Sequence, residues 1–209
     1  MKSTSLALPA LTAAAIFASA TASQAAVILN EGLDNTGTPS VVSTNSGKAI
    51  NFVMGTGTDT LLTTIELGIG TFTGSPAPLV ELWSNQADAT PIGTLLATMT
   101  NPGTFTASAV NTFTHTGYTL TVGATYWVVV RNTVASTGFE WLGSTDTSVT
   151  SSNGSTHTAR LFSSTNNSPS LWNSASGVLN QVRITAVPEP STALLGGLGL
   201  LALLRRRRP

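Results

Sequence analysis

The sequence predicts an all-β protein, an antiparallel β-sandwich of jelly-roll type, and three observations support this fold class. Apolar and polar residues alternate with a period of two in several short segments, as in strands that bury one face. Gly, Pro, Asn and Ser separate these segments, which indicates tight turns. No window of about eleven residues between residues 26 and 186 repeats apolar residues at helical spacing. Short strands joined by such turns are typical of β-sandwiches.

Two segments define the expected sheets most clearly. In residues 61–69, alternate residues form one face that we expect to be buried: Leu61, Thr63, Ile65, Leu67 and Ile69. Residues 125–131 are apolar on both faces, which predicts a central strand covered on both sides. The other strands are expected at residues 49–54, 78–83, 92–100, 104–109, 112–115, 139–142, 159–162 and 178–186. Residues 135–176 are rich in Ser, Thr and Asn and are expected to form long surface loops around two short strands.

The first residues have the features of a secretory signal peptide. Met1 and Lys2 supply a short positive region, and residues 6–20 are mostly apolar. Small residues then occupy the two positions that a signal peptidase inspects. We therefore expect residues 1–25 to form a signal helix that signal peptidase removes, with cleavage after Ala25 and, as second choice, after Ala26.

The last residues form three parts in a fixed order. Pro188 and Pro190 fix φ and lack a backbone N–H, so the Val187-Pro188-Glu189-Pro190 turn is expected to be stiff and exposed. Residues 193–204 predict a short hydrophobic helix of about 18 Å, less than the ~30 Å hydrocarbon core of a bilayer. An arginine cluster follows and is expected to stay in the cytoplasm: Arg205, Arg206, Arg207 and Arg208. A buried C-terminal helix and a free-standing membrane anchor are the alternatives.

This order of parts resembles the PEP-CTERM sorting signal of Gram-negative bacteria that make exopolysaccharide. The resemblance implies export through the inner membrane and a transient anchor there, a hydrophobic transmembrane helix in the tail. It also implies that an exosortase, a membrane-embedded transpeptidase-like enzyme, cleaves near the Pro-Glu-Pro turn, so that the protein reaches the cell surface or extracellular matrix. We therefore divide the chain into a signal peptide at residues 1–25, a surface domain at residues 26–186 and a sorting signal at residues 187–209.

The surface domain carries a second resemblance. The succession LTTIELGIG, PLVELWSNQADATPIGTLLATMT and YTLTVGATYWVVVRN precedes a late strand that runs into VPEP. This pattern is similar to the choice-of-anchor domains of bacterial surface proteins, in particular type R. The resemblance implies a β-sandwich with an interchangeable sorting tail and brings no catalytic residues.

Composition and charge exclude several classes of site. The chain has no cysteine, so disulfides, thiolate catalysis and zinc–thiolate centres are excluded. The formal net charge is zero, but residues 26–187 contain four basic and eight acidic residues, a balance of −4. Without a basic cluster, nucleic acid is not an expected partner. No cofactor is expected.

Candidate catalytic residues are few, and we expect no enzyme. Glu66 and Glu81 are expected on neighbouring strands and are the only candidates for the two carboxylates of a glycoside hydrolase. Scattered carboxylates on the solvent face of a sheet are the favoured interpretation. His115 and His157 stand alone in the sequence, so neither is assigned to a catalytic or metal site.

Three aspartates are weighed as calcium ligands: Asp34, Asp59 and Asp146. Because no D-x-D-x-D-G loop is present, solvated loop carboxylates are the favoured interpretation and no metal site is assigned.

The tryptophans give the remaining functional indication. Trp127 is expected in the core, whereas Trp141 and Trp172 have polar neighbours and are expected to be exposed. Exposed indoles stack on sugar rings, so these two residues are the candidate carbohydrate contacts. The leading hypothesis is a non-enzymatic surface or matrix protein linked to exopolysaccharide and biofilm. The alternatives are a carbohydrate-binding module for exopolysaccharide, a secreted hydrolase and an ice-binding protein, although no sustained threonine repeat supports the last.

Overall fold

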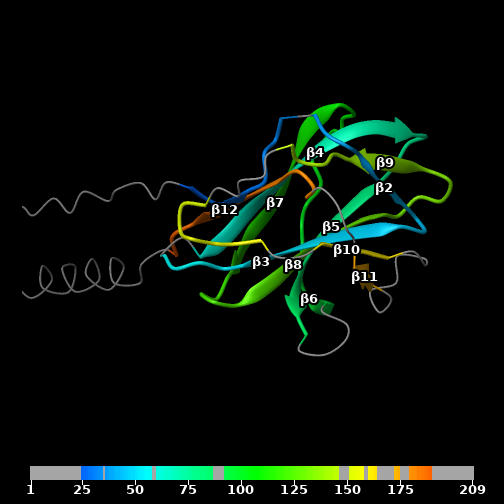
Figure 1. Cartoon of the computed structure of the whole chain (residues 1–209). Coiled ribbons are helices and arrows are strands. Elements are labelled where there is room, and N and C mark those ends of the chain that lie inside the picture. Colours follow the sequence, from blue (N-terminus) through cyan, green and yellow to red (C-terminus); the bar gives the residue numbers. More distant parts are fainter. Residues whose placement is uncertain are drawn as a thin grey trace, which may run out of the picture.

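A computed structural model of the chain describes residues 25–34, 36–57, 60–86, 92–145, 151–157, 160–163, 172–174 and 179–189. Within these ranges the backbone forms strands and no helix, so the predicted all-β class is confirmed (Figure 1). The signal helix and the short hydrophobic helix, which we expected to flank the sandwich, lie outside the described residues.

The strands of the described residues form two antiparallel sheets, which Figure 1 shows as two layers. Sheet A contains β1 (Ala26–Asn30), β2 (Ser40–Ser43), β4 (Leu61–Thr73), β7 (Ala109–Thr119), β9 (Gly138–Trp141) and β12 (Val182–Val187). Sheet B contains β3 (Gly47–Val53), β5 (Pro78–Asn85), β6 (Ile92–Thr98), β8 (Thr125–Asn132), β10 (Arg160–Ser163) and β11 (Trp172–Ser174), in the order β11-β10-β3-β8-β5-β6.

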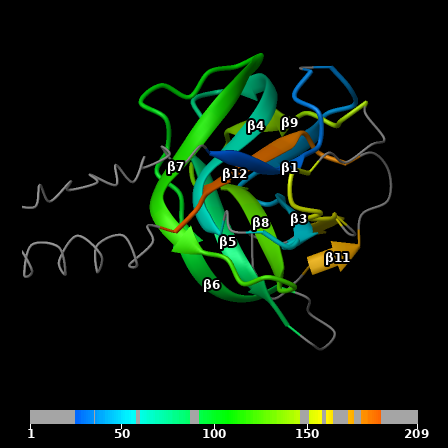
Figure 2. The ribbon, with the colours of Figure 1, turned by 90° about the vertical axis from the view of Figure 1, so that its left-hand side faces the viewer.

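The long strand β4 is the centre of sheet A. One edge of β4 pairs with β7, and the other edge pairs first with β12 and then with β9. Strand β1 pairs with the outer edge of β12, as Figure 2 shows, and β2 pairs with β9. The sheet is therefore built from strands that are distant in sequence, and β12 is enclosed between β1 and β4.

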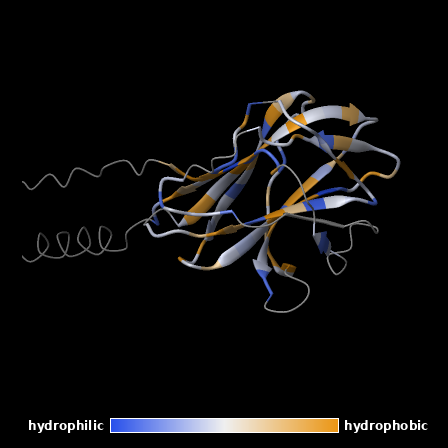
Figure 3. Cartoon of the chain, viewed as in Figure 1, coloured by the Kyte–Doolittle hydropathy of each residue, from blue (hydrophilic) through white to orange (hydrophobic). Residues whose placement is uncertain are grey.

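The main hydrophobic core lies between the two sheets. Ile65 and Leu67 of β4 are fully buried there with Val128 and Val130 of β8. Hydrophobic residues are concentrated in the strands (Figure 3). Since the chain has no cysteine, this core and the strand ladders supply the stability that disulfides give many exported domains.

The prediction of a doubly covered strand at residues 125–131 is confirmed. Strand β8 pairs with β3 on one side and β5 on the other. Val128 and Val130 face the core between the sheets, whereas Trp127 and Val129 belong to a second apolar cluster on the outer face of sheet B. Because one face of β8 packs in the main core and the other face packs in this second cluster, the positions on both faces of the strand are apolar.

The predicted burial of β4 is wrong at its first residues. Leu62, not Leu61, is buried, while the later positions follow the predicted face. The ladder to β12 passes from Leu62 to Thr64 without a partner for Thr63, so Thr63 is a β-bulge. A bulge shifts the alternation of buried and exposed residues by one position. The apolar–polar pattern of the sequence does not indicate where such a bulge occurs.

Other strand boundaries also differ from the prediction. Residues 104–109 and 112–115 were expected as separate strands, but one strand, β7, begins at Ala109 and continues to Thr119. The short strands β1, β2 and β11 were not predicted. Each is an edge strand or belongs to a short peripheral pair, so few of its residues alternate clearly.

Candidate functional site

The C-terminal strand β12 leads directly into the Pro-Glu-Pro turn. Its ladder with β4 extends from Val182, opposite Leu67, to Val187, opposite Leu61. Pro188 follows and has no backbone N–H to donate to a neighbouring strand. The regular structure therefore ends at the residue before the first proline.

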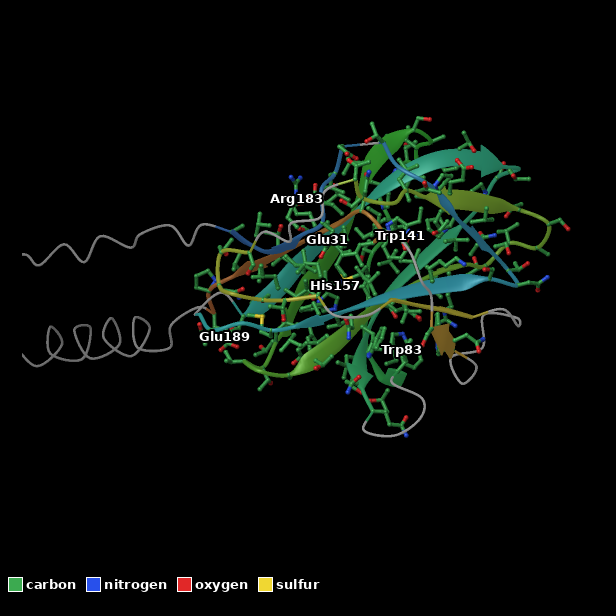
Figure 4. The ribbon with its side chains drawn as sticks, in the orientation of Figure 1. Glu31, Trp83, Trp141, His157, Arg183 and Glu189 are labelled. Carbon is green, nitrogen blue, oxygen red and sulfur yellow. The ribbon has the colours of Figure 1, made fainter. Side chains whose placement is uncertain are left out.

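The residues of the turn lie at the surface beside β4. Glu189 is exposed, and Thr60 Oγ1 donates a long hydrogen bond of 3.5 Å to its Oε1. Figure 4 shows Glu189 at one end of the sandwich. Pro190, the last residue of the turn, lies outside the described residues. The carboxylate of the turn is thus presented to solvent beside the start of β4.

The start of the sandwich lies beside this end of β12. Ala26, the first residue of β1, is paired with Ala186, and Ala25 is exposed. If signal peptidase cleaves after Ala25 as predicted, the new N-terminus stands next to the sorting turn. The cleavage position itself stays a prediction.

Comparison with known proteins identifies the C-terminal segment. Residues 186–208 match the family model of the PEP-CTERM protein-sorting motif. No curated protein and no solved structure matches the chain. The motif implies an exported protein that is held at the membrane during sorting and processed by an exosortase. Its match begins at Ala186, so the fold and the motif overlap at the end of β12.

The matched segment includes the residues that the sequence singled out. Val187, Pro188, Glu189 and Pro190 fall at its beginning, and Arg205 to Arg208 fall at its end. The arginine cluster and residues 193–204 are outside the described part of the structure. Among the residues that the structure describes, no helix has the length and hydropathy needed to cross a membrane.

The two carboxylates weighed for glycoside hydrolysis do not come together. Glu66 lies on β4 in sheet A, and Glu81 lies on β5 in sheet B, so the prediction that their strands are neighbours is wrong. Glu66 accepts two hydrogen bonds from Arg183, at 2.5 and 2.8 Å, which raise the pKa of that guanidinium. Glu81 is paired with Arg131 and accepts the indole N–H of Trp83. Each carboxylate thus has its own cation in a different sheet.

The outer face of sheet A also bears on the ice-binding hypothesis. One cross-strand row consists of threonines, in which Thr64 lies between Thr114 and Thr185. The next row contains the Glu66–Arg183 ion pair. Among the described residues of this face, the ion pair thus interrupts the threonines after one complete row, and the next row keeps only Thr112.

The two tryptophans expected to be exposed are buried. Trp141 is fully buried between the sheets and donates its indole N–H to the Gln181 carbonyl at 2.7 Å. Trp172 is 8% exposed and packs in the outer cluster of sheet B with Trp127, which is buried as predicted. The prediction of exposure failed because polar sequence neighbours do not report which face of a strand a side chain occupies. A buried ring offers no face for a sugar to stack on.

Asp34, one of the aspartates weighed as a calcium ligand, is held by donors from the protein. Its carboxylate accepts hydrogen bonds from Thr145 Oγ1 at 2.5 Å, from the Thr36 amide at 3.0 Å and from the Gln181 side chain. The bonds from Thr145 and Thr36 lower its pKa. No cluster of three acidic or histidine side chains occurs among the described residues, and Asp59 and Asp146 lie outside them.

Proposed function

We propose that this chain is a non-enzymatic surface or matrix protein of a Gram-negative bacterium that makes exopolysaccharide, with a role in biofilm. Its folded part is the cargo of the sorting signal. The observation that carries the proposal is the junction at β12, where a strand enclosed between β1 and β4 passes into the matched motif without an intervening linker. A sandwich joined to a sorting tail in this way needs no catalytic centre to serve as a surface component.

The same junction supports a choice-of-anchor domain, of type R or similar, as the folded part. That family combines a β-sandwich with interchangeable sorting tails, and here an antiparallel two-sheet fold ends one residue before Pro188. The tail then acts as a separable module. The boundary between the surface domain and the sorting signal falls between Ala186 and Val187 in this proposal.

The contacts and positions of Glu66 and Glu81 support the non-enzymatic role. The two candidates for acid–base chemistry are each engaged with an arginine, and they belong to opposite layers of the sandwich. Hydrolysis of a glycosidic bond needs two carboxyl groups about 5 to 9.5 Å apart on either side of one bond. A secreted hydrolase therefore has no supporting observation in these residues.

The experiment that tests the proposal is fractionation of cells with and without the exosortase. In cells that contain the enzyme, the protein is expected in the surface or extracellular fraction, because the tail has been removed. In cells without it, the protein is expected to stay with the inner membrane. An identical distribution in both strains would overturn the proposal, since sorting would then not depend on the matched motif.

A further inference from the structure

The outer face of sheet B carries three indoles at positions that normally face solvent. Trp83 of β5 is paired directly with Trp127 of β8 and, on its other side, with Leu95 of β6. Leu95 is 48% exposed. Trp172 of β11 completes the cluster, and Trp83 is its partly exposed member. We call Trp83, Trp127 and Trp172 together the indole face.

The Glu81–Arg131 ion pair lies beside the indole face, with Glu81 buried and Arg131 partly exposed. Glu81 is only 4% exposed although its strand position points out of the sandwich, and it accepts hydrogen bonds from Arg131 and, at 3.0 Å, from Trp83 Nε1. The guanidinium carbon of Arg131 lies 6.0 Å from the centroid of the Trp83 ring. A buried ion pair adds little net stability compared with apolar residues of similar volume. The partly exposed Arg131 places a charged group of this pair at the surface beside Trp83.

One indole of this face has an unused donor. Trp172 is more than nine-tenths buried, and its Nε1 has no hydrogen-bond partner among the residues that the structure describes. By contrast, Trp127 Nε1 donates to Asn85 Oδ1 at 2.9 Å. Buried indole N–H groups usually have a partner, so the unsatisfied donor of Trp172 points to an acceptor that a ligand would bring.

A hollow adjoins the same ion pair. It has a volume of 320 Å³ and is lined by Thr44, Leu79, Arg131, Asn132 and Thr133. Arg131 lines the hollow and also pairs with Glu81, so this one residue contacts both. Hydroxyl and amide groups thus lie in the hollow, and the guanidinium of Arg131 lies between them and the Trp83 ring.

We propose that the indole face and this hollow form a binding site for a neutral polysaccharide. The apolar C–H face of a sugar ring packs against Trp83, and adjacent hydroxyls exchange hydrogen bonds with Glu81 and Arg131. A ring or hydroxyl oxygen accepts the N–H of Trp172. The ion pair is electrically neutral, and the charge of the surface domain is negative, which disfavours acidic polymers.

This proposal deepens the matrix role proposed above and names its ligand, but it does not depend on sorting. The exported protein is purified and run on native gels cast with dextran, hydroxyethylcellulose or xyloglucan, and with polygalacturonate as an acidic polymer. Retardation by at least one of the three neutral polymers is expected. The Trp83→Ala variant is expected to weaken that binding at least tenfold, because it removes the partly exposed ring.

The matched control is Glu66→Gln, which alters the corresponding ion pair on the outer face of the opposite sheet and is expected to change binding less than twofold. Circular dichroism and thermal melting establish whether each variant is folded. If Trp83→Ala does not fold, Trp83→Phe is tested in its place, and a measurable loss of polysaccharide binding is expected. No retardation by any neutral polymer, retardation by polygalacturonate alone, or unchanged binding by the folded Trp83 variant would each overturn the proposal. None of these results affects the fractionation experiment, so the two proposals fail separately.

Discussion

Gln181 connects three segments that are far apart in the sequence. Its side chain is fully buried, and Nε2 donates to the Thr36 carbonyl at 2.6 Å, to the Gly143 carbonyl at 3.0 Å and to the Asp34 carboxylate. These contacts fix the loop after β1 and the segment after β9 at the beginning of β12. The residue thereby positions the strand that leads into the sorting motif.

The carboxylate of Asp34 makes the same region sensitive to pH. Hydrogen bonds from Thr145 and Thr36 lower its pKa in the folded chain. The ionised carboxylate therefore stabilises the fold above its unfolded pKa of about 3.9, and this contribution is lost as the pH falls through the lower, folded pKa. The free energy of unfolding, measured by urea titration, is expected to differ between the wild type and Asp34→Asn at pH 6. That difference should shrink at pH 2 to 3, and a difference that is independent of pH would contradict this assignment.

At the scale of elements, β4 organises sheet A because two strands share one of its edges. Gly68 lies between the part of β4 that pairs with β12 and the part that pairs with β9. Its amide donates a hydrogen bond to the Gln181 carbonyl at 3.4 Å. A Cβ at this position would overlap Gln181 Oε1 and touch the Gln181 Cβ. Gly68→Ala is therefore expected to destabilise the protein by about 1–3 kcal/mol, measured by urea unfolding followed through tryptophan fluorescence.

A second glycine provides the control for this substitution. A Cβ at Gly103 would have no atom within 4 Å, so Gly103→Ala is expected to change the free energy of unfolding by no more than about 0.5 kcal/mol. If both substitutions have the same effect, the close packing of Gln181 against β4 is not what makes position 68 sensitive.

The sequence allowed most of the strands to be predicted, because alternation is a local property. Strands β3, β4, β5, β6 and β8 lie close to their predicted ranges. The bulge at Thr63 and the short strand β2 were missed because both depend on partners elsewhere in the chain. Local periodicity contains no information about such partners.

The contacts of the candidate site residues were harder to predict than the strands. Glu66 and Arg183 are paired although 117 positions separate them, and sequence reasoning placed Glu66 beside Glu81 instead. Trp83 and Glu81 are two positions apart, so the alternation of a strand places them on one face of β5. Nothing in the sequence indicated that Trp172 packs in the same cluster as Trp83. The sorting motif is different, because a contiguous segment carries it and no fold is needed to recognise it.

At the scale of the whole molecule, the predicted signal-peptide cleavage position and the sorting turn lie side by side. Strand β1 begins at Ala26, opposite Ala186, and β12 ends at Val187, immediately before the turn. The folded sandwich therefore presents its start and the sorting turn at one end, with the indole face on the outer surface of the other sheet. The proposed ligand-binding residues therefore lie apart from the sorting turn, with Trp83 as the partly exposed ring.

The intact mass of the exported protein from cells that contain the exosortase shows most directly whether the tail is removed. We expect a species that begins at Ala26 and ends between Val187 and Pro190, because the body is complete at β12 and the matched motif begins there. A mass that still includes Arg205 to Arg208 would contradict processing by the exosortase, since the tail would then be a permanent anchor and not a signal that is removed.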